Sequence, residues 1–224
     1  LTAPYDLNYV DELDKYLPAY KIGSGDITWR EILIKIAKKS KPVILASGAS
    51  TLKETIEATR LLLKYNKKIV LMQCNTNYTS STDNYNYINL LALKQFKKIF
   101  KDKVILGLSD HTAGHASVLG SIALGARVIE KHFTDKNERI GPDHKFSMNP
   151  KTWKEMIKSS RELEKCLGNG KKKLEEKNLV KKIWIYQKRV LQIIEIKINY
   201  EIRKTNTRTF RQIRSIFKSF KRYD

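Results

Sequence analysis

The chain has 224 residues, of which 41% are hydrophobic and 30% are charged. This composition is ordinary for a folded globular protein and excludes a chain that is disordered throughout. Its longest apolar runs are far shorter than the roughly 20 residues that cross a bilayer, and no signal-peptide pattern opens the sequence. We therefore expect a cytoplasmic protein with no membrane partner.

The formal net charge of +21 is unevenly distributed along the chain. Residues 1–168 contain 27 basic and 18 acidic residues, whereas residues 169–224 contain 17 and 5. Residues 171–224 lack Gly and Pro, which favours a helical or partly disordered tail, or the product of a shifted reading frame. The lysines and arginines of this tail are interleaved with four aromatic residues, Trp184, Tyr186, Phe210 and Phe217. A second hypothesis is therefore a non-catalytic protein whose tail contacts a polyanion such as nucleic acid.

Short, nearly continuous apolar runs recur every 22 to 36 residues and predict strands buried on both faces, as in a parallel sheet. They lie at 19–25, 41–48, 67–74, 103–110 and 126–133. Amphipathic segments of helical length alternate with them, at 29–40, 51–66, 86–100 and 115–125, and another follows at 152–168. This alternation predicts βαβ units.

The strand ends are followed by polar residues rather than by tight hairpin turns, which favours an α/β fold of the (β/α)8 TIM-barrel type. An open doubly wound sheet is the alternative, although no GxGxxG motif follows the first strand. Only five of eight strands are visible, and "LTAPYD" at the start is a candidate end of another. We expect a barrel without its first strands over residues 1–170, followed by a basic tail over 171–224.

A parallel barrel would bring the polar residues at the strand ends to one rim. A lysine with several hydroxyl groups suits a phosphate, and two neutral imidazoles with oxygen donors suit Mn²⁺ or Mg²⁺. The residues at these ends are Lys21, Ser24, Ser47, Asn75, Asn77, Tyr78, Ser109, Asp110, His111, Glu130 and His132.

Each candidate also has a structural interpretation. A single histidine at a strand end is more often a hydrogen-bonded structural residue, but two in equivalent places favour a site. We assign His115 to structure. Asp143, in the loop at 139–150, suits either a polyol contact or a turn. Cys74 and Cys166 lack metal-ligand spacing and are expected to be reduced.

Six motifs in order, "YKIGSGDIT", "KPVILASGASTL", "CNTNY", "GLSDHT", "ALGARVIEKHFTD" and "GPDHKFSMNP", resemble those of the sialic acid synthase family, which includes the N-acetylneuraminate, legionaminate and pseudaminate synthases. The resemblance covers residues 1–170. It implies condensation of phosphoenolpyruvate with an N-acylated mannose-type sugar, giving a nine-carbon 2-keto acid and phosphate, in an enzyme that uses a divalent metal and forms a homodimer.

The resemblance also implies roles for individual residues. His111 and His132 correspond to metal ligands. The candidate catalytic residues are these two histidines and Asp26. The phosphoenolpyruvate phosphate would contact Thr2, Lys21, Ser24, Ser47 and Ser109, and the sugar would contact Asn77, Tyr78 and Asp143.

Several features depart from the family pattern. Asp26 stands where some members have Glu, and Ala46 stands where others have a phosphate-contacting Ser, which Ser47 would replace. The family's first two strands and its C-terminal antifreeze-like domain are not recognisable. We therefore expect little or no turnover from the isolated chain. A Schiff-base aldolase using Lys21 is a third hypothesis.

Overall fold

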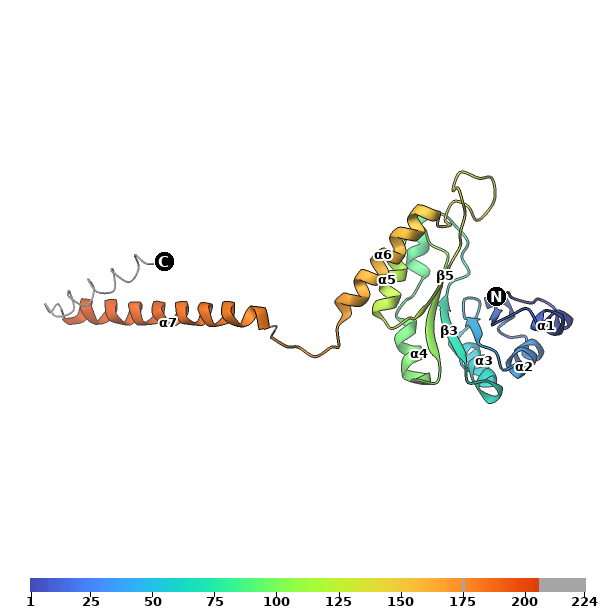
Figure 1. The fold of residues 1–224 in the computed structure, drawn as a ribbon, viewed down its shortest axis with the longest axis horizontal. Helices are drawn as coiled ribbons and strands as arrows, with labels where there is room; N and C mark the ends of the chain where they lie inside the picture. The colour runs from blue at the N-terminus through green and yellow to red at the C-terminus, as the bar shows by residue number, and fades with distance from the viewer. Residues whose placement is uncertain (175, 206–224) are drawn as a thin grey trace. The chain divides into compact units, whose positions relative to one another are not determined.

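The computed structural model describes residues 1–174 and 176–205. The chain divides into two units, Leu1–Asn169 and Gly170–Asp224. Two of the tail aromatic residues named above, Phe210 and Phe217, lie outside the described residues. The first unit contains a parallel sheet with helices along it (Figure 1).

All five expected strands form, and they pair in parallel in the order β1-β2-β3-β4-β5. Parallel neighbours in sequence order are what successive βαβ units produce. The strands are β1 (Tyr20–Ile22), β2 (Val43–Ala46), β3 (Ile69–Cys74), β4 (Ile105–Asp110) and β5 (Val128–Lys131). A parallel bridge joins Thr2 to Tyr20 beyond β1, as the opening "LTAPYD" suggested, and another joins Phe133 to Met148.

The helices follow the expected alternation, with two differences. Helix α1 was not predicted, and α4 begins at Ala92 because a 3-10 segment, η2 (Thr82–Tyr87), occupies the preceding residues. The elements are α1 (Leu7–Asp14), η1 (Ser24–Asp26), α2 (Arg30–Lys38), α3 (Leu52–Tyr65), α4 (Ala92–Phe100), α5 (Ala116–Ala123), α6 (Pro150–Leu167) and, in the second unit, α7 (Glu176–Thr205).

Local chemistry sets the beginnings of the two best-defined helices. Thr51 caps α3 by accepting from the backbone of Glu54, whose carboxylate accepts from the Thr51 backbone in return. Asn149 and Thr152 make the same reciprocal pair at α6, where Pro150 occupies the first helical position. Both capping boxes satisfy backbone donors that the first turn of a helix leaves unpaired.

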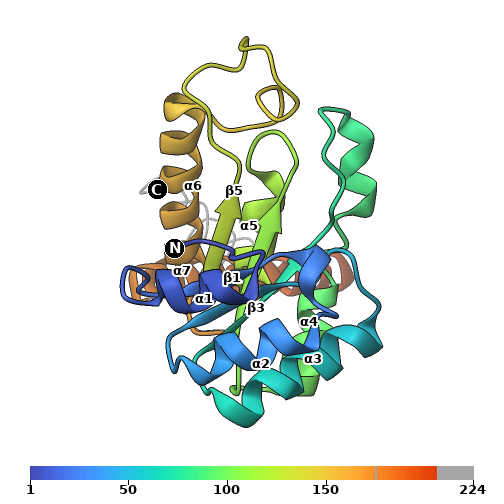
Figure 2. The same cartoon turned by 90° about the vertical axis from the view of Figure 1, so that its right-hand side faces the viewer.

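The strands alternate between two faces, and one face packs against the helices. Side chains such as Tyr20, Leu45, Leu71 and Leu106 enter a core shared with α2, α3 and α4, which run along that side of the sheet (Figure 2). Because the side-chain period of a strand is two, the residues between them point to the opposite face. Sequence position in the strand therefore decides which side chains are available for a site.

The strands β3, β4 and β5 approach closely at Gly107. A Cβ added there would lie 2.8 Å from the Val128 carbonyl oxygen and 3.0 Å from Met72 Cγ. A backbone oxygen cannot move aside as a flexible side chain can. Glycine is therefore required at this position of β4 for β5 to pair at its observed separation.

A buried ion pair joins β4 to β5 on the helix side of the sheet. Lys131 Nζ lies 2.8 Å from Asp110 Oδ2, and the two side chains are 1% and 0% exposed. Lys131 also donates to the Thr112 carbonyl oxygen, and the Asp110 carboxylate accepts from the hydroxyl groups of Thr112 and Ser117. These additional hydrogen bonds offset the cost of removing two charges from water.

Helix α7, at 30 residues, is the longest of the described helices. Within residues 1–174 and 176–205, no helix combines the length and the apolar character that a bilayer span requires.

Replacing Lys131 with Met should destabilise the first unit, because Asp110 would remain buried without its counter-charge. We expect the free energy of unfolding to fall by about 3–5 kcal/mol in urea titrations. The double variant Asp110→Asn/Lys131→Met should recover much of this loss, since no buried charge is left. Lys97→Met, which removes an exposed ion pair with Asp102, is the control and should leave the midpoint unchanged. Equal effects of Lys131→Met and Lys97→Met would contradict the interpretation.

Candidate functional site

A pocket of about 480 Å³ lies where the carboxyl ends of the strands meet the opening segment of the chain and the loop after β5. Parallel strands commonly place their sites at this end. Most of the residues proposed from sequence line it. The lining residues are Leu1, Thr2, Ala3, Tyr5, Lys21, Gly23, Ser24, Ala46, Cys74, Tyr78, Ser109, His111, Glu130, His132 and Asp143.

Strand register places the polar residues of the pocket side by side. Cys74 of β3 pairs with Ser109 of β4, and Ser109 pairs with Glu130 of β5. These residues alternate with Asp110 and Lys131, which occupy the opposite face. His111 and His132 follow two residues after Ser109 and Glu130, so both imidazoles lie on the pocket side.

Lys21 supplies a positive charge to the pocket lining, and its Nζ lies 3.0 Å from Glu130 Oε2. The contact is an ion pair without hydrogen-bond geometry, and Glu130 Oε2 is buried and accepts no hydrogen bond. The two residues belong to the opposite edge strands, β1 and β5. The sheet must therefore curve enough to bring its edges together across the concave face. Glu130 was recognised as a strand end, but its pairing with Lys21 was not predicted.

The His111 ring is held from one side by the main chain. Its Nδ1 lies 2.7 Å from the Asn75 carbonyl oxygen, and because a carbonyl oxygen only accepts, Nδ1 must carry the proton and leave Nε2 as the acceptor. Burial, and next the neighbouring His132, lower the pKa of His111 below its usual value. Both effects favour the neutral imidazole, the form that binds metal ions.

The second imidazole, His132, is positioned by the loop at 132–149. Its Nδ1 lies 3.4 Å from Asp143 Oδ2, and the two rings of His111 and His132 have centroids 5.0 Å apart. The loop is folded back by Asn137, which donates to the carbonyl oxygens of His144 and Ser147. This fold brings Asp143 to the pocket, where the sequence alone left it open between a site and a turn.

Two aromatic rings enclose the histidine pair. Tyr78 lies 4.3 Å from the His111 ring and 5.5 Å from the His132 ring, centroid to centroid. Phe146, which is buried, lies 5.1 Å from His132. Partial burial raises the pKa of the Tyr78 hydroxyl, so at neutral pH it is a hydrogen-bond donor. Phe146 was missed in the sequence, where only its place in "HKFSM" after Asp143 could have indicated it.

A buried asparagine, Asn84, ties together the ends of β3 and β4. Its Oδ1 accepts from Asn75 Nδ2 at 2.7 Å, and its Nδ2 donates to the carbonyl oxygens of Asn77 and His111 at 3.0 and 3.3 Å. Asn84 is 1% exposed and lies in η2, a segment that the sequence reading assigned no role. It fixes the main chain on both sides of the His111 ring.

Five residues proposed from sequence do not line the pocket. Asp110 lies on the helix side, paired with Lys131, and Asn75 contacts His111 through its carbonyl oxygen. Ser47 is buried and its hydroxyl donates to the Met72 carbonyl oxygen at 2.8 Å. Asn77 is exposed, and its carbonyl oxygen accepts from Asn84. Asp26 lies in η1, and burial raises the pKa of its carboxyl group. Their roles in the site stay predictions.

The histidine pair fits a divalent cation as two nitrogen ligands. Each Nδ1 contacts an oxygen, so each Nε2 remains for a ligand bond, an arrangement typical of metal-binding histidines. Asn75 also retains a buried Oδ1 with no hydrogen-bond partner. No group of three or more His, Cys, Asp or Glu side chains with the arrangement of a metal site occurs among the described residues. The remaining positions would therefore be filled by other oxygen ligands.

Comparison with known proteins identifies the family. A model of the NeuB family matches residues 1–172. The chain is 42% identical over 186 residues to N,N'-diacetyllegionaminic acid synthase of Campylobacter jejuni, which covers 80% of this chain and 54% of that protein. An uncharacterised protein of Methanocaldococcus jannaschii is 46% identical over 174 residues, 77% of this chain and 50% of its own length. The chain belongs to the NeuB family.

This membership confirms the resemblance to sialic acid synthases that six sequence motifs indicated. The structure is similar to that of N-acetylneuraminic acid synthetase from Leptospira borgpetersenii in complex with citrate, with a TM-score of 0.72 and 27% identity over 81% of this chain and 62% of that one. The five-stranded sheet is thus a parallel half-barrel of the NeuB type. The chain spans about half the length of the curated relatives it matches.

The two cysteines of this NeuB-family chain should differ in reactivity. Cys74 is buried beside the pocket, and burial raises the pKa of its thiol, whereas Cys166 is exposed on α6. Because the thiolate is the reactive form, we expect iodoacetamide at about pH 8 to modify Cys166 at least about tenfold faster than Cys74. Mass spectrometry of the peptides measures both rates. In urea the difference should disappear, and equal rates in the folded chain would contradict the assignment.

Proposed function

We propose that this chain contributes the substrate and metal site of a synthase that condenses phosphoenolpyruvate with an N-acylated mannose-type sugar, giving a nine-carbon 2-keto acid and phosphate. The observation that carries the proposal is the convergence of Lys21, Ser109, His111 and His132 on one pocket. A phosphate-binding cation and a cation-binding pair of imidazoles are the two parts that such a condensation needs. Family membership supports the same reaction class.

The phosphate of phosphoenolpyruvate would bind at Lys21. The ammonium group supplies a point charge, and the hydroxyl groups of Ser24 and Ser109 supply donors for phosphate oxygens. Ser24 and Ser109 are 7% and 4% exposed, so the phosphate would lose most of its water and gain these contacts in exchange. Glu130 is the present partner of Lys21 at 3.0 Å, and a phosphate would compete with it for the ammonium group.

The sugar would bind on the side of the pocket formed by Tyr78 and Asp143. A carboxylate accepts from sugar hydroxyl groups, and an aromatic ring packs against the apolar face of a sugar. A divalent cation held by His111 and His132 would supply Lewis-acid polarisation of the sugar aldehyde oxygen. Placing the phosphate at Lys21 and the aldehyde at the histidines would hold the two reactants in one pocket, which reduces the entropic cost of their encounter.

The proposed condensation forms one carbon–carbon bond and breaks one carbon–oxygen bond. The C3 carbon of phosphoenolpyruvate forms a bond to the aldehyde carbon, whose oxygen takes a proton to become a hydroxyl group. Water adds at C2, the bond between C2 and the bridging oxygen breaks, and phosphate leaves with that oxygen while C2 becomes the keto carbon. Lys21 is placed to hold the leaving phosphate, since its charge offsets the negative charge of that group.

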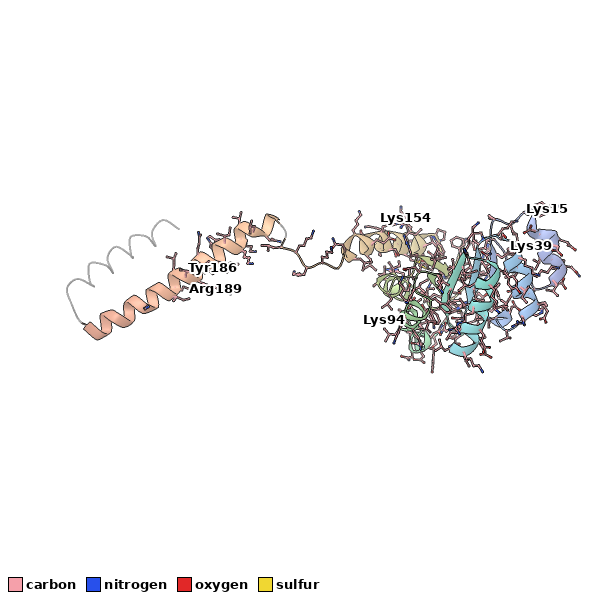
Figure 3. All side chains as sticks on the ribbon, turned by 90° about the horizontal axis from the view of Figure 1, so that it is seen from below. Lys15, Lys39, Lys94, Lys154, Tyr186 and Arg189 are labelled. Atoms are coloured by element: carbon pink, nitrogen blue, oxygen red, sulfur yellow. The ribbon has the colours of Figure 1, made fainter. Side chains whose placement is uncertain are left out.

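Binding measurements test the two halves of the site separately. Lys21→Met should weaken phosphoenolpyruvate binding by about tenfold or more, because the charge that faces the phosphate is lost. Isothermal titration calorimetry measures the dissociation constant. Lys94→Met is the matched control, since Lys94 is exposed on α4, outside the pocket (Figure 3), and should leave binding unchanged.

Mn²⁺ binding should depend on the histidines and not on Lys21. We expect His111→Ala and His132→Ala each to weaken it by about tenfold or more, measured by electron paramagnetic resonance of the free ion. His115→Ala, at the start of α5 and outside the pocket lining, should bind Mn²⁺ normally. Phosphoenolpyruvate and Mn²⁺ that bind without dependence on any of these residues would refute the site.

The reaction itself has an isotopic signature. If phosphate is released only when the sugar is also present, phosphoenolpyruvate labelled with ¹⁸O at the bridging position should transfer the label to phosphate, because the carbon–oxygen bond breaks. Label retained in the organic product would exclude this mechanism. Borohydride trapping of a keto acid on Lys21 would instead support the Schiff-base hypothesis.

A further inference from the structure

Helix α7 carries two apolar rows side by side. One row is Leu179, Ile183, Tyr186, Val190 and Ile193, and the other contains Val180, Trp184 and Leu191, all at spacings of three, four or seven residues. Residues at these spacings share one side of a helix. The exposed fractions of Leu179, Val180, Ile183, Trp184, Tyr186, Leu191 and Ile193 lie between 47% and 75%.

The other side of the same helix is basic. Residues 177–194 contain five lysines and arginines and no acidic residue. Lys182 lies four residues before Tyr186, and Lys188 lies four residues after Trp184 with its Nζ 4.5 Å above the indole ring. Cations therefore flank both edges of the apolar face. Figure 3 labels Tyr186, of the apolar face, and Arg189, which lies three residues further along the helix.

We propose that α7 binds the surface of an anionic lipid bilayer, with its axis in the plane of the interface. A bilayer surface takes up both sides of such a helix, because the apolar face enters the boundary of the acyl chains while flanking lysines reach the phosphate groups. Trp184 and Tyr186 are the residue types that favour this depth. Lysines and arginines near an anionic leaflet add to binding through attraction to its negative surface potential.

Other occupants use less of this surface. Nucleic acid would contact the basic side and leave the two apolar rows in water. A second copy of α7 would cover a narrow seam, whereas the apolar face is two rows wide, and it would bring Lys182 and Lys188 close to the same charges on the partner helix. The expectation of no membrane partner rested on the short apolar runs, which test for a spanning helix and not for one that lies on the surface.

Two isoleucines provide a matched test in the full chain. Ile183 lies in the centre of the apolar face, whereas Ile185 lies on the basic side and is 39% exposed. Ile183→Gln and Ile185→Gln change the same side chain without changing the charge. We expect Ile183→Gln to weaken binding to phosphatidylcholine–phosphatidylglycerol vesicles by about tenfold, and Ile185→Gln by less than about threefold. Sedimentation with vesicles measures both.

Tryptophan fluorescence gives a second measurement. Anionic vesicles should shift the emission of the chain to shorter wavelength and protect it from acrylamide, and Trp184→Phe should abolish the change while Trp29 and Trp153 still emit. Vesicles of phosphatidylcholine alone should bind more weakly. Equal effects of the two isoleucine variants, or no binding to anionic vesicles, would overturn the proposal. So would duplex DNA bound in preference to vesicles, or a lipid-free dimer that Ile183→Gln dissociates.

Discussion

The ion pair between Asp110 and Lys131 is the interaction on which the site depends. It joins β4 to β5 in register on the helix side of the sheet, and both side chains are fully buried. Because side chains alternate in a strand, this pairing sends Ser109, His111 and their β5 counterparts to the pocket. A slip of one residue would place two charges in the pocket and the imidazoles against the helices, so the ion pair specifies register as well as stability.

Curvature of the sheet brings the pocket residues of β1 close to those of β5. Strands β1 and β5 are not neighbours, yet Lys21 and Glu130 meet at 3.0 Å across the concave face. A flat sheet would separate Lys21 from Glu130 and His132 by the width of three intervening strands, each about 4.8 Å apart. The phosphate and metal halves of the proposed site are therefore one site only because successive βαβ units curl the sheet.

Periodicity and strand-end chemistry were enough to predict the five strands, the pocket at their carboxyl ends and the two histidines. They could not predict contacts set by loops. Asn84 acts through the main chain of distant residues, and Phe146 packs on His132 from a long loop, so neither has a local signature. Ser47 shows a further limit, because a strand-end hydroxyl assigned to the phosphate donates to the Met72 carbonyl oxygen of a neighbouring strand, and its role in the site stays a prediction.

The histidine pair is better suited to holding a cation than to transferring protons. Burial and the proximity of the second ring lower the pKa of His111, and the Asn75 carbonyl oxygen fixes the proton on Nδ1. An imidazole held in one tautomer presents a lone pair on its other nitrogen rather than a transferable proton, and the two ring centroids lie 5.0 Å apart. In the other ring, His132 Nδ1 lies 3.4 Å from Asp143 Oδ2. The proposed divalent cation would therefore lie beside Tyr78 and Phe146, whose rings adjoin the two imidazoles.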